Sequence, residues 1–340
     1  MNGLKKIRTI GIACNIKGCC AKGAHTGDDR QEEYDEPETI EAIAAELKGL
    51  GYTPVIFAQD ECFLDRLQHE PPDLMFNIAE GLGVTRGRES QVPCLLESLN
   101  IPYTGSDPVA LGITLDKYLT RQMLHASYVP VPEMYLVRRP GDISMLKGIF
   151  KKTRHWIVKP RWEGSSKGVF RKSLVGDYEA LKAQVMFVLE TYNQPAVVEE
   201  FMEKMEITAA VCGNAEPKLL GMMQIAPRAA GDAPFIYSLE VKRDWEKQVE
   251  YRGQESIPPS VRSRVESLAV KAFSALELRD IARIDFRLDR ELVPRVIDIN
   301  PLPGLSPRYS DLPILYRLRG GKYPDLIRII LTEAMKRYGY

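Results

Sequence analysis

Two alternating stretches near the end of the chain carry the side chains best suited to chemistry. Arg283 and Asp285 stand two residues apart in the first stretch, and Asp298 and Asn300 stand two apart in the second. Side chains of a strand alternate between its two faces, so each pair shares one face. On neighbouring strands, two carboxylates, an amide and an arginine would meet over one site. Hard oxygen ligands of this kind suit magnesium that also contacts nucleotide phosphates, which points to ATP chemistry.

A loop of small and polar residues follows an apolar strand that ends at Lys159 and Pro160. The main loop residues are Glu163, Gly164, Ser165, Ser166, Lys167 and Gly168. Their backbone N–H groups and hydroxyls can surround phosphate oxygens, and Lys159 supplies a positive charge beside them. The sequence lacks the GxxxxGK[ST] pattern of a P-loop, so we expect a different kind of phosphate-covering hairpin.

A second buried strand leads into a connector that could hold a nucleoside. The residues concerned are Glu199, Glu200, Phe201, Met202 and, slightly further on, Glu206. Backbone groups of such a connector can hydrogen-bond an adenine, and a nearby carboxylate can accept hydrogen bonds from ribose hydroxyls. Each motif alone also fits a solvated charged surface, which is the better interpretation for any single strand or loop. Their combination in one chain favours a nucleotide site.

Composition limits the class of protein. With 340 residues, 44% of them hydrophobic and 27% charged, the chain is long enough for two or three globular domains. The 46 Lys and Arg residues balance 46 Asp and Glu residues, which gives no electrostatic case for a nucleic-acid partner. The apolar runs are too short to cross a membrane or to form a secretory signal peptide. We therefore expect a cytoplasmic protein that acts on small molecules.

Three successive units are expected to position these motifs. Residues 8–104 alternate apolar runs with helical patterns, which is typical of a parallel α/β unit. The expected strands include residues 53–58, 73–77, 156–160, 169–170 and 196–200, and the expected helices include residues 40–47, 177–192 and 323–334. The polar or aperiodic stretches at 16–35 and 226–259 are expected to be long irregular segments.

Taken in order, the motifs resemble those of the ATP-grasp superfamily, and of the D-alanine:D-alanine ligases in particular. The matching segments extend over nearly the whole chain and are residues 101–106, 115–117, 158–160, 163–166, 198–200, 283–285 and 300–304. The resemblance implies a three-domain ATP-grasp fold built from α/β and α+β units. Its N-terminal domain would cover residues 1–106, its central domain 107–200 and its C-terminal domain 201–340.

The resemblance also implies ATP- and magnesium-dependent joining of amino acids or amino-acid-like molecules. ATP would phosphorylate a carboxylate, and an amine would attack the acyl phosphate to give an amide, ADP and phosphate. Asp285, Asp298 and Asn300 would hold two magnesium ions, which manganese could replace, with Asp298 standing where the family more often has Glu. A homodimer is expected from the same resemblance.

Further roles follow from the same correspondence. Lys117, Lys159 and Lys242 would hold the ATP phosphates under the loop at 163–168, residues 199–202 would hold the adenine, and Glu206 the ribose. Arg283 and the backbone of Gly304 would stabilise charge on the acyl phosphate and its tetrahedral adduct. The expected catalytic residues are Arg283, Gly304, Lys242, Ser165 and Glu32.

Departures from the family pattern fall at the amino-acid pockets. Phe76 and Asn77 stand where members often carry a His-Gly pair. The loop from Asn15 to Asp35 replaces a short glycine-rich turn, and Glu32 or Glu33 is the candidate for the glutamate that holds the first amino group. Arg308 and Tyr309 occupy a region that usually contributes a serine to the second carboxylate. These changes favour substrates other than D-alanine.

Arg243 is the most informative departure, because the family has a tyrosine there. An arginine offers a permanent charge and five donors, so one hypothesis is that it binds an anionic or larger polar group of the substrate. The alternative is a surface ion pair with Glu240, Asp244 or Glu246. Other functions stay open as well: D-alanyl-D-alanine synthesis for cell-wall precursors, a ligase whose acceptor is a hydroxy acid or a larger amine, and an ATP-binding protein without turnover.

Overall fold

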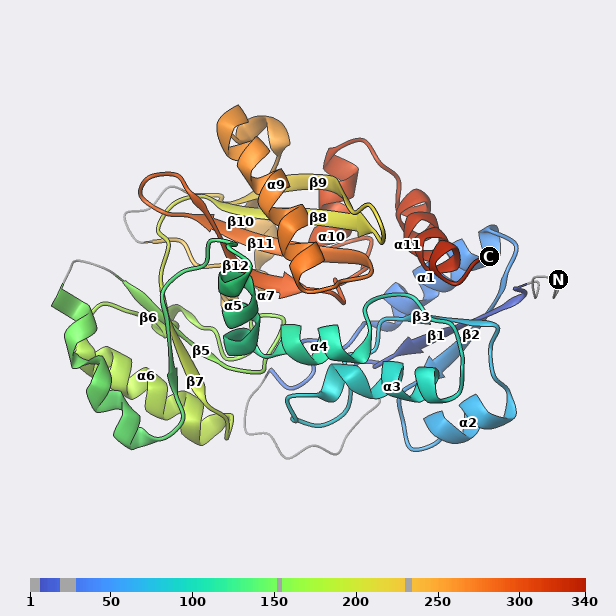
Figure 1. Ribbon diagram of the computed structural model, residues 1–340, viewed down its shortest axis with the longest axis horizontal. Coiled ribbons are helices and arrows are strands. Elements are labelled where there is room, and N and C mark those ends of the chain that lie inside the picture. The colour runs from blue at the N-terminus through green and yellow to red at the C-terminus, as the bar shows by residue number, and fades with distance from the viewer. Residues whose placement is uncertain (1–6, 19–28, 152–154, 230–233) are drawn as a thin grey trace.

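The computed structural model describes residues 7–18, 29–151, 155–229 and 234–340, and these form three sheets that follow one another along the chain (Figure 1). The first sheet contains β1 (Thr9–Cys14), β2 (Thr53–Ala58) and β3 (Leu74–Asn77). The second contains β4 (Met134–Val137), β5 (Trp156–Pro160), β6 (Leu174–Val175) and β7 (Ala196–Glu200). The third contains β8 (Glu206–Gly213), β9 (Lys218–Pro227), β10 (Val249–Gly253), β11 (Asp280–Leu288) and β12 (Pro294–Asn300). Each sheet lies inside one predicted domain range, and the boundaries themselves stay a prediction.

The first sheet is parallel, with strand order β2-β1-β3. Its helices are α1 (Pro37–Gly49), α2 (Phe63–His69) and α3 (Gln91–Ser98), with a 3-10 turn, η1 (Arg88–Ser90), before α3; α4 (Pro108–Leu115) follows and contacts η1. Helix α1 begins with a proline and buries Ile40, Ile43 and Leu47, as the spacing predicts. Ligands of such sheets bind beyond the carboxyl ends of the strands where the strand order reverses, which here is the edge where β1 and β3 end.

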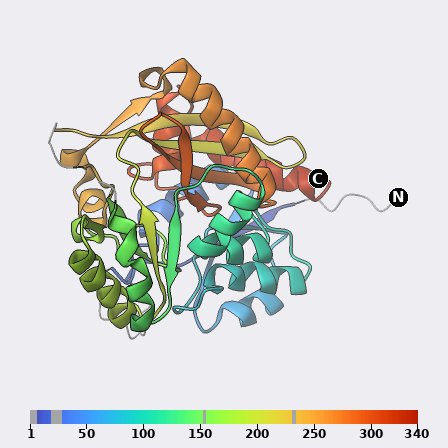
Figure 2. The same cartoon turned by 60° about the vertical axis from the view of Figure 1, so that its left-hand side comes forward.

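The second sheet is antiparallel, with strand order β4-β7-β5-β6. Helix α6 (Tyr178–Thr191) and the 3-10 segment η2 (Pro140–Lys151) pack on one face, and α5 (Lys117–Ala126) precedes the sheet (Figures 1 and 2). The strand expected at 169–170 is wrong, because Val169 instead packs beside Ile157 and Phe201. A 3-10 turn, η3 (Arg171–Ser173), follows, and β6 forms only after it.

The third sheet is also antiparallel, with strand order β10-β9-β8-β11-β12. Its helices are α7 (Leu239–Arg243), α8 (Trp245–Gln248), α9 (Pro259–Ala275), α10 (Asp311–Leu318) and α11 (Tyr323–Arg337), and a 3-10 turn, η4 (Gln254–Ser256), follows β10. The stretch at 226–259 is therefore more ordered than expected. Its two helices are too short to display a helical period, and β10 is an edge strand on which Tyr251 packs against Trp245.

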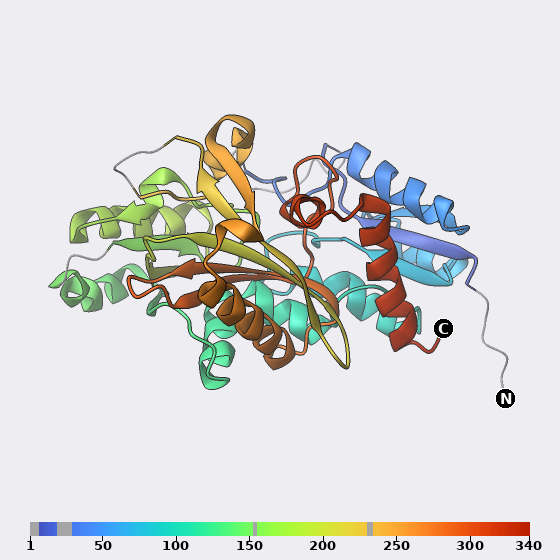
Figure 3. The same cartoon turned by 90° about the horizontal axis from the view of Figure 1, so that it is seen from above.

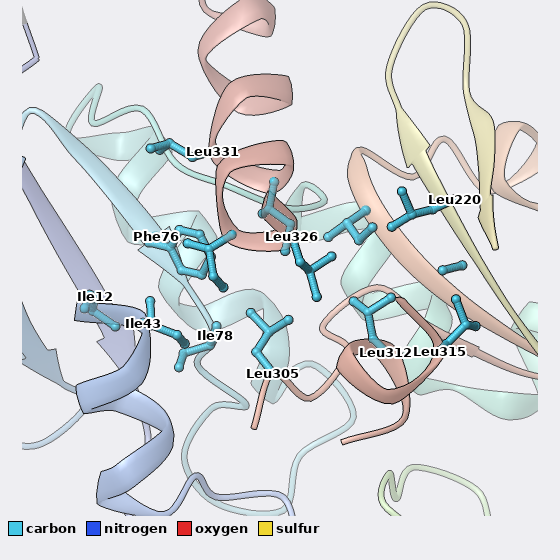
Figure 4. Close-up of a cluster of buried hydrophobic side chains, with 14 of the residues drawn as sticks. Ile12, Ile43, Phe76, Ile78, Leu220, Leu305, Leu312, Leu315, Leu326 and Leu331 are labelled. Atoms are coloured by element: carbon cyan, nitrogen blue, oxygen red, sulfur yellow. The ribbon is translucent and has the colours of Figure 1, made fainter. Parts of the chain in front are cut away.

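A hydrophobic cluster joins the two ends of the chain (Figure 4). It combines Ile12 and Phe76 of the first sheet with Leu220 of β9, Leu312 of α10 and Leu326 of α11. Helix α11 also lies beside α1, as the view from above illustrates (Figure 3). The C-terminal helices thus hold the first sheet against the third, so that the loops at their edges face one site. Within the described residues, no helix is both long and apolar enough to span a membrane.

Candidate functional site

Strands β11 and β12 bring the four chemically suited side chains together as the alternation predicts. Arg283 pairs directly with Asn300 across the two strands, and Asp285 pairs with Asp298. Asn300 Nδ2 donates to Asp285 Oδ2 at 3.0 Å, and Arg283 Nη2 lies 3.0 Å from the same oxygen. Thr208 Oγ1, from neighbouring β8, donates to Asp285 Oδ1 at 2.9 Å. The Asp285 carboxylate is thus fixed in position by three donors.

The direct pairing of two carboxylates bears on the predicted magnesium site. Like charges opposite one another destabilise a sheet unless a cation offsets them. Burial raises the pKa of Asp285 despite Arg283, whereas Lys117, Lys159 and Arg283 outweigh burial at Asp298 and lower the pKa of that group. Among the described residues no three His, Cys, Asp or Glu side chains gather as a metal cluster. The set here instead combines two carboxylates with an amide, a donor chemistry that fits magnesium.

Arg283 is held between two acidic groups. Its Nη1 lies 3.1 Å from Asp311 Oδ2 at the start of α10, while its Nη2 contacts Asp285. Gly304 lies on the connector to α10, where an added Cβ would stand 2.8 Å from Ser310 Oγ. That hydroxyl accepts a hydrogen bond from Ser306 N at 3.0 Å, which closes the turn. A side chain at position 304 would therefore crowd Ser310, and glycine suits this close approach.

A first cavity, here called the lysine cavity, contains the three predicted phosphate-binding lysines. Lys159 Nζ lies 3.2 Å from Glu199 Oε1, and Lys117 Nζ lies 3.6 Å from Asp298 Oδ1. Lys242 Nζ lies 5.4 Å from the centre of the Tyr237 ring, and burial, followed by nearby Arg283, lowers the pKa of Lys242. The cavity is lined, among others, by Ile157, Val169, Phe201, Met202, Glu206, Asp285 and Asp298. Positive charge and an apolar wall thus meet in one space.

The predicted nucleoside residues divide between two faces of the chain. Glu199 lines the lysine cavity, but its carboxylate is paired with Lys159 and Arg121, and its backbone is paired within the sheet. Glu200, the next residue, lines a separate surface hollow with Glu133 and Arg295, because strand side chains alternate. Its side chain therefore does not belong to this cavity.

Sequence reasoning missed Arg287, which lies in the lysine cavity beside Glu206. Arg287 Nη1 stands 3.6 Å from Glu206 Oε2, and the guanidinium lies 4.3 Å from the centre of the Phe201 ring. Nothing among the described residues accepts a hydrogen bond from its buried Nε. The continuing alternation 283, 285, 287 on β11 was the signal that could have placed this residue in the site.

The glycine and serine loop has a strained backbone. Ser165 and Ser166 both adopt left-handed conformations, with φ of 46° and 59°, which non-glycine residues visit rarely. At Gly168 an added Cβ would stand 2.3 Å from Pro160, so the loop needs glycine to turn back on its strand. Such strain persists only where surrounding contacts impose it.

Those contacts come from the N-terminal loop, whose described part holds two buried acids. Glu33 Oε1 accepts from Gly164 N and Arg88 Nη2, both at 2.7 Å, and Glu33 Oε2 lies 3.1 Å from Lys167 Nζ. Burial opposes ionisation, but Arg88 and Lys167 outweigh it and lower the pKa of Glu33 to about 2. Asp29 accepts from Gly168 N at 2.9 Å. Glu33 is therefore an anchor for the loop; it also lines the cavity described below, and its binding of substrate stays a prediction.

Glu163 is an anchor of the same kind. Its carboxylate accepts from Gln194 Nε2 at 2.7 Å and lies 2.6 Å from Lys167 Nζ. Its backbone oxygen accepts from Lys117 Nζ at 2.7 Å. The side chain thus fixes the loop to its base, and the backbone oxygen holds Lys117, one of the lysines predicted to bind phosphate.

The structure pairs two residues that the sequence assigned separately to the substrate. Arg243 Nη2 lies 2.5 Å from Glu32 Oε1, so α7 is tied to the N-terminal loop. Glu32 was not among the three acids, Glu240, Asp244 and Glu246, that the sequence suggested as ion-pair partners of Arg243. Arg308 lies at the surface with its side chain 80% exposed and Nη2 3.5 Å from Glu246 Oε1, so it is not brought to the site.

A second cavity, here called the acidic cavity, adjoins the first. Its lining includes Glu32, Asp35, Asn77, Glu80, Glu89, Gly304 and Tyr309. Lys117, Glu163, Ser165, Arg283, Asp298 and Asn300 line both cavities. The two spaces therefore meet at the arginine, the carboxylate and the amide of β11 and β12. Asn77 was noted in the sequence only as a departure from the family's His-Gly pair and was given no role, and Glu80 and Glu89 were not predicted as site residues.

Comparison with known proteins places this geometry in a family. Residues 123–332 match the family model described as D-ala D-ala ligase C-terminus. An uncharacterized protein of Sinorhizobium fredii, y4sG, is 29% identical over 97% of each chain. A D-alanine–D-alanine ligase of Desulforudis audaxviator is 30% identical over 87% of this chain and 92% of the relative.

Solved structures agree in fold at lower identity. A D-alanine–D-alanine ligase from Bacillus anthracis complexed with ATP has a TM-score of 0.73 at 21% identity, and the match covers 98% of both chains. The VanG D-Ala:D-Ser ligase from Enterococcus faecalis has a TM-score of 0.73 at 15% identity over 97% of this chain and all of that one. With the family model matching well over half of its length, the chain belongs to the D-alanine:D-alanine ligase family and has the ATP-grasp fold.

Proposed function

We propose that this protein is an ATP- and magnesium-dependent ligase that joins two amino-acid-like molecules through an acyl phosphate. The observation that carries the proposal is the contact between the two cavities at Arg283, Asp298 and Asn300. A nucleotide in the lysine cavity would present its terminal phosphate at this junction. A carboxylate in the acidic cavity would reach the same place, which brings the reacting groups together.

The residues at the junction suit each part of the reaction. A carboxylate oxygen attacks the terminal phosphorus of ATP and ADP leaves, while Lys117, Lys159 and Lys242 hold phosphate oxygens. The amine lone pair then attacks the acyl carbon, the C–O bond to phosphate breaks, and the nitrogen loses a proton. Arg283 and the N–H of Gly304 stabilise negative charge on the acyl oxygen as it develops. Because Asp285 and Asp311 hold Arg283 in place, little reorganisation is needed.

Asp285, Asp298 and Asn300 are the residues that would hold magnesium, and the resemblance predicts two ions. Magnesium bound there would neutralise charge on the transferring phosphate. The loop at 163–168 would cover the site. Glu33 and Asp29 of the N-terminal segment anchor this loop through its backbone N–H groups. Water would be excluded while both cavities are filled.

We further propose that the substrates differ from a pair of D-alanine molecules. The lysine cavity keeps the three lysines that the family resemblance predicts, with Asp298 in place of the more common Glu, whereas the acidic cavity differs from the family pattern at Asn77 and in the N-terminal loop. The relatives named as D-alanine–D-alanine ligases are at most about a third identical, which leaves room for another specificity. Synthesis of D-alanyl-D-alanine is the second candidate, favoured by those same relatives.

The test is ADP and phosphate formation from MgATP with D- and L-amino acids, supplied singly and in pairs, with mass spectrometry of the product. We expect magnesium-dependent ADP formation that requires an amino acid, and a product lighter by one water than the sum of its two parts. Stimulation by D-alanine alone, giving the dipeptide, would establish the second candidate. Tight ATP binding without amino-acid-dependent ADP formation would instead identify a nucleotide-binding protein without turnover.

A further inference from the structure

Three carboxylates line one wall of the acidic cavity without a counter-charge. Asp35, Glu80 and Glu89 all line this space. No Lys, Arg or His of the described residues forms an ion pair with any of them. The neighbouring cations are already used: Arg88 pairs with Glu33, and Arg243 pairs with Glu32. Lys117 lies against Asp298 and the Glu163 backbone. These three carboxyl groups are therefore left without a cationic partner among the described residues.

A network of amide side chains fixes this wall before any ligand arrives. Asn15, directly after β1, accepts at Oδ1 from the backbone N–H groups of Glu80 at 2.8 Å and Gly81 at 3.1 Å. Asn15 Nδ2 donates to Gln59 Oε1 at 3.1 Å, and Gln59 Nε2 donates to Gln91 Oε1 at 2.9 Å. Preorganised acids of this kind can bind a charged group at low reorganisation cost.

Asn77 supplies an independent sign of a missing ligand. It ends β3, lines the same cavity and is only 4% exposed. Its Oδ1 accepts from Ala79 N at 3.2 Å, but its buried Nδ2 has no partner among the described residues. A buried amide donor without an acceptor costs free energy, so a partner is expected from outside the protein. That partner must carry an oxygen acceptor.

We propose that Glu80 and Glu89 bind an ammonium or guanidinium group on the substrate's side chain, which does not react, and that Asn77 binds a carboxylate oxygen of the same substrate. The glutamates pair with the cation, and Asn77 Nδ2 donates to the oxygen. The preferred substrate is then a basic amino acid or an amine-bearing analogue of one. This inference rests on the proposed ligase function.

The electrostatics of the empty wall agree with this assignment. Burial, followed by the nearby charges of Glu89 and Glu33, raises the pKa of Glu80 well above its ordinary value, against the opposing effect of Arg88. Burial raises the pKa of Asp35 to about 7, with Glu36 adding to the effect. A bound cation would favour the ionised carboxylates and offset the cost of burying them.

The experiment compares lysine with norleucine, which has nearly the same shape but lacks the side-chain ammonium. Both enantiomers are supplied alone and with D-alanine, and kcat/KM is measured from ADP formation. We expect lysine to exceed norleucine by about 10-fold or more, the effect of one charge-assisted hydrogen bond. In the Glu80→Gln and Glu89→Gln variants, the ratio of kcat/KM for lysine to kcat/KM for norleucine should fall towards one. Asn77→Ala should lower kcat/KM for both amino acids and leave the ratio unchanged, and Glu41→Gln, on the exposed face of α1, is the matched control.

Each outcome bears on a different claim. If no amino acid stimulates ADP formation, the proposed ligase function fails. If norleucine or D-alanine is used as well as lysine, and the glutamine variants keep the parent's ratio, the function stands and the cationic site is wrong. Should the variants not fold, calorimetry on the parent protein decides: binding of lysine no tighter than of norleucine overturns the inference.

Discussion

The lysine cavity and the acidic cavity are built by different kinds of structure. The lysine cavity is formed largely by paired strands, in which cross-strand register fixes Asp285 opposite Asp298 and Lys159 beside Glu199. The acidic cavity is formed largely by segments that follow strands or connect elements, at residues 32–35, 77–80 and 303–310. Chemistry common to a family can be held by register, whereas specificity can change when loops change. Mutations in the lysine cavity and in the acidic cavity should therefore have different effects on activity.

The largest effect is expected at the junction. Asp298→Ala should lower kcat about 10²- to 10³-fold for every substrate, because a magnesium site that bridges phosphates has few protein ligands. Thermal unfolding and ADP formation at several magnesium concentrations would be measured together. Asp65→Ala, on the exposed surface of α2, is the control. Full turnover in a well-folded Asp298→Ala protein would remove the metal assignment.

Glu33 of the N-terminal loop holds the loop at 163–168, and replacing Glu33 should lower the stability of the fold more than it changes substrate choice. Its pKa is lowered to about 2 in the folded protein, from about 4.3 in an unfolded chain. The resulting stability, about 2–3 kcal/mol, is present above the unfolded value and is lost as the pH falls from about 5 to 2. Glu33→Gln should lose this contribution at neutral pH and flatten the acid limb of a stability curve.

Denaturant unfolding between pH 3 and pH 7 measures this effect. Glu32→Gln is the matched control, because Glu32 is the adjacent acid and pairs with the partly exposed Arg243. If both variants lose the same stability, or if neither does, Glu33 does not anchor the loop.

Lys159→Ala should raise the KM for ATP about 10-fold whichever amino acid is supplied, since it removes one charge-assisted contact from the lysine cavity. The amino-acid KM should change little. Lys182→Ala, on an exposed face of α6, is the control. A change confined to the amino-acid KM would show that the two cavities are not separate in function.

The smallest effect is expected at Arg243. Its ion pair with Glu32 is partly exposed, and such pairs contribute about 0.2–1 kcal/mol. Arg243→Tyr should therefore change kcat/KM by about 5-fold at most and leave the ranking of amino acids intact. A double-mutant cycle with Glu32→Gln measures the coupling directly. A reversed ranking would restore the hypothesis that Arg243 selects the substrate.

The contrast between strand register and loop packing also explains which parts of the site could be predicted from the sequence. Alternation placed Arg283, Asp285, Asp298 and Asn300 correctly, because a strand period of two determines which side chains share a face. It could not place Glu33 against Arg88, since that contact joins residues 55 positions apart and depends on how one loop packs on another. The shift of the expected strand at 169–170 to β6 has a similar cause, because apolar residues in a loop can pack as well as residues in a strand.

The cluster that joins the two ends of the chain has a consequence for synthesis. Ile12 and Phe76 are synthesised well before Leu326 and its neighbours on α11, which cover them. During translation one apolar face of the first sheet therefore stays uncovered until α11 has been made, and the growing chain is exposed to aggregation in that interval. Truncation before α11 would leave a protein that cannot close this core.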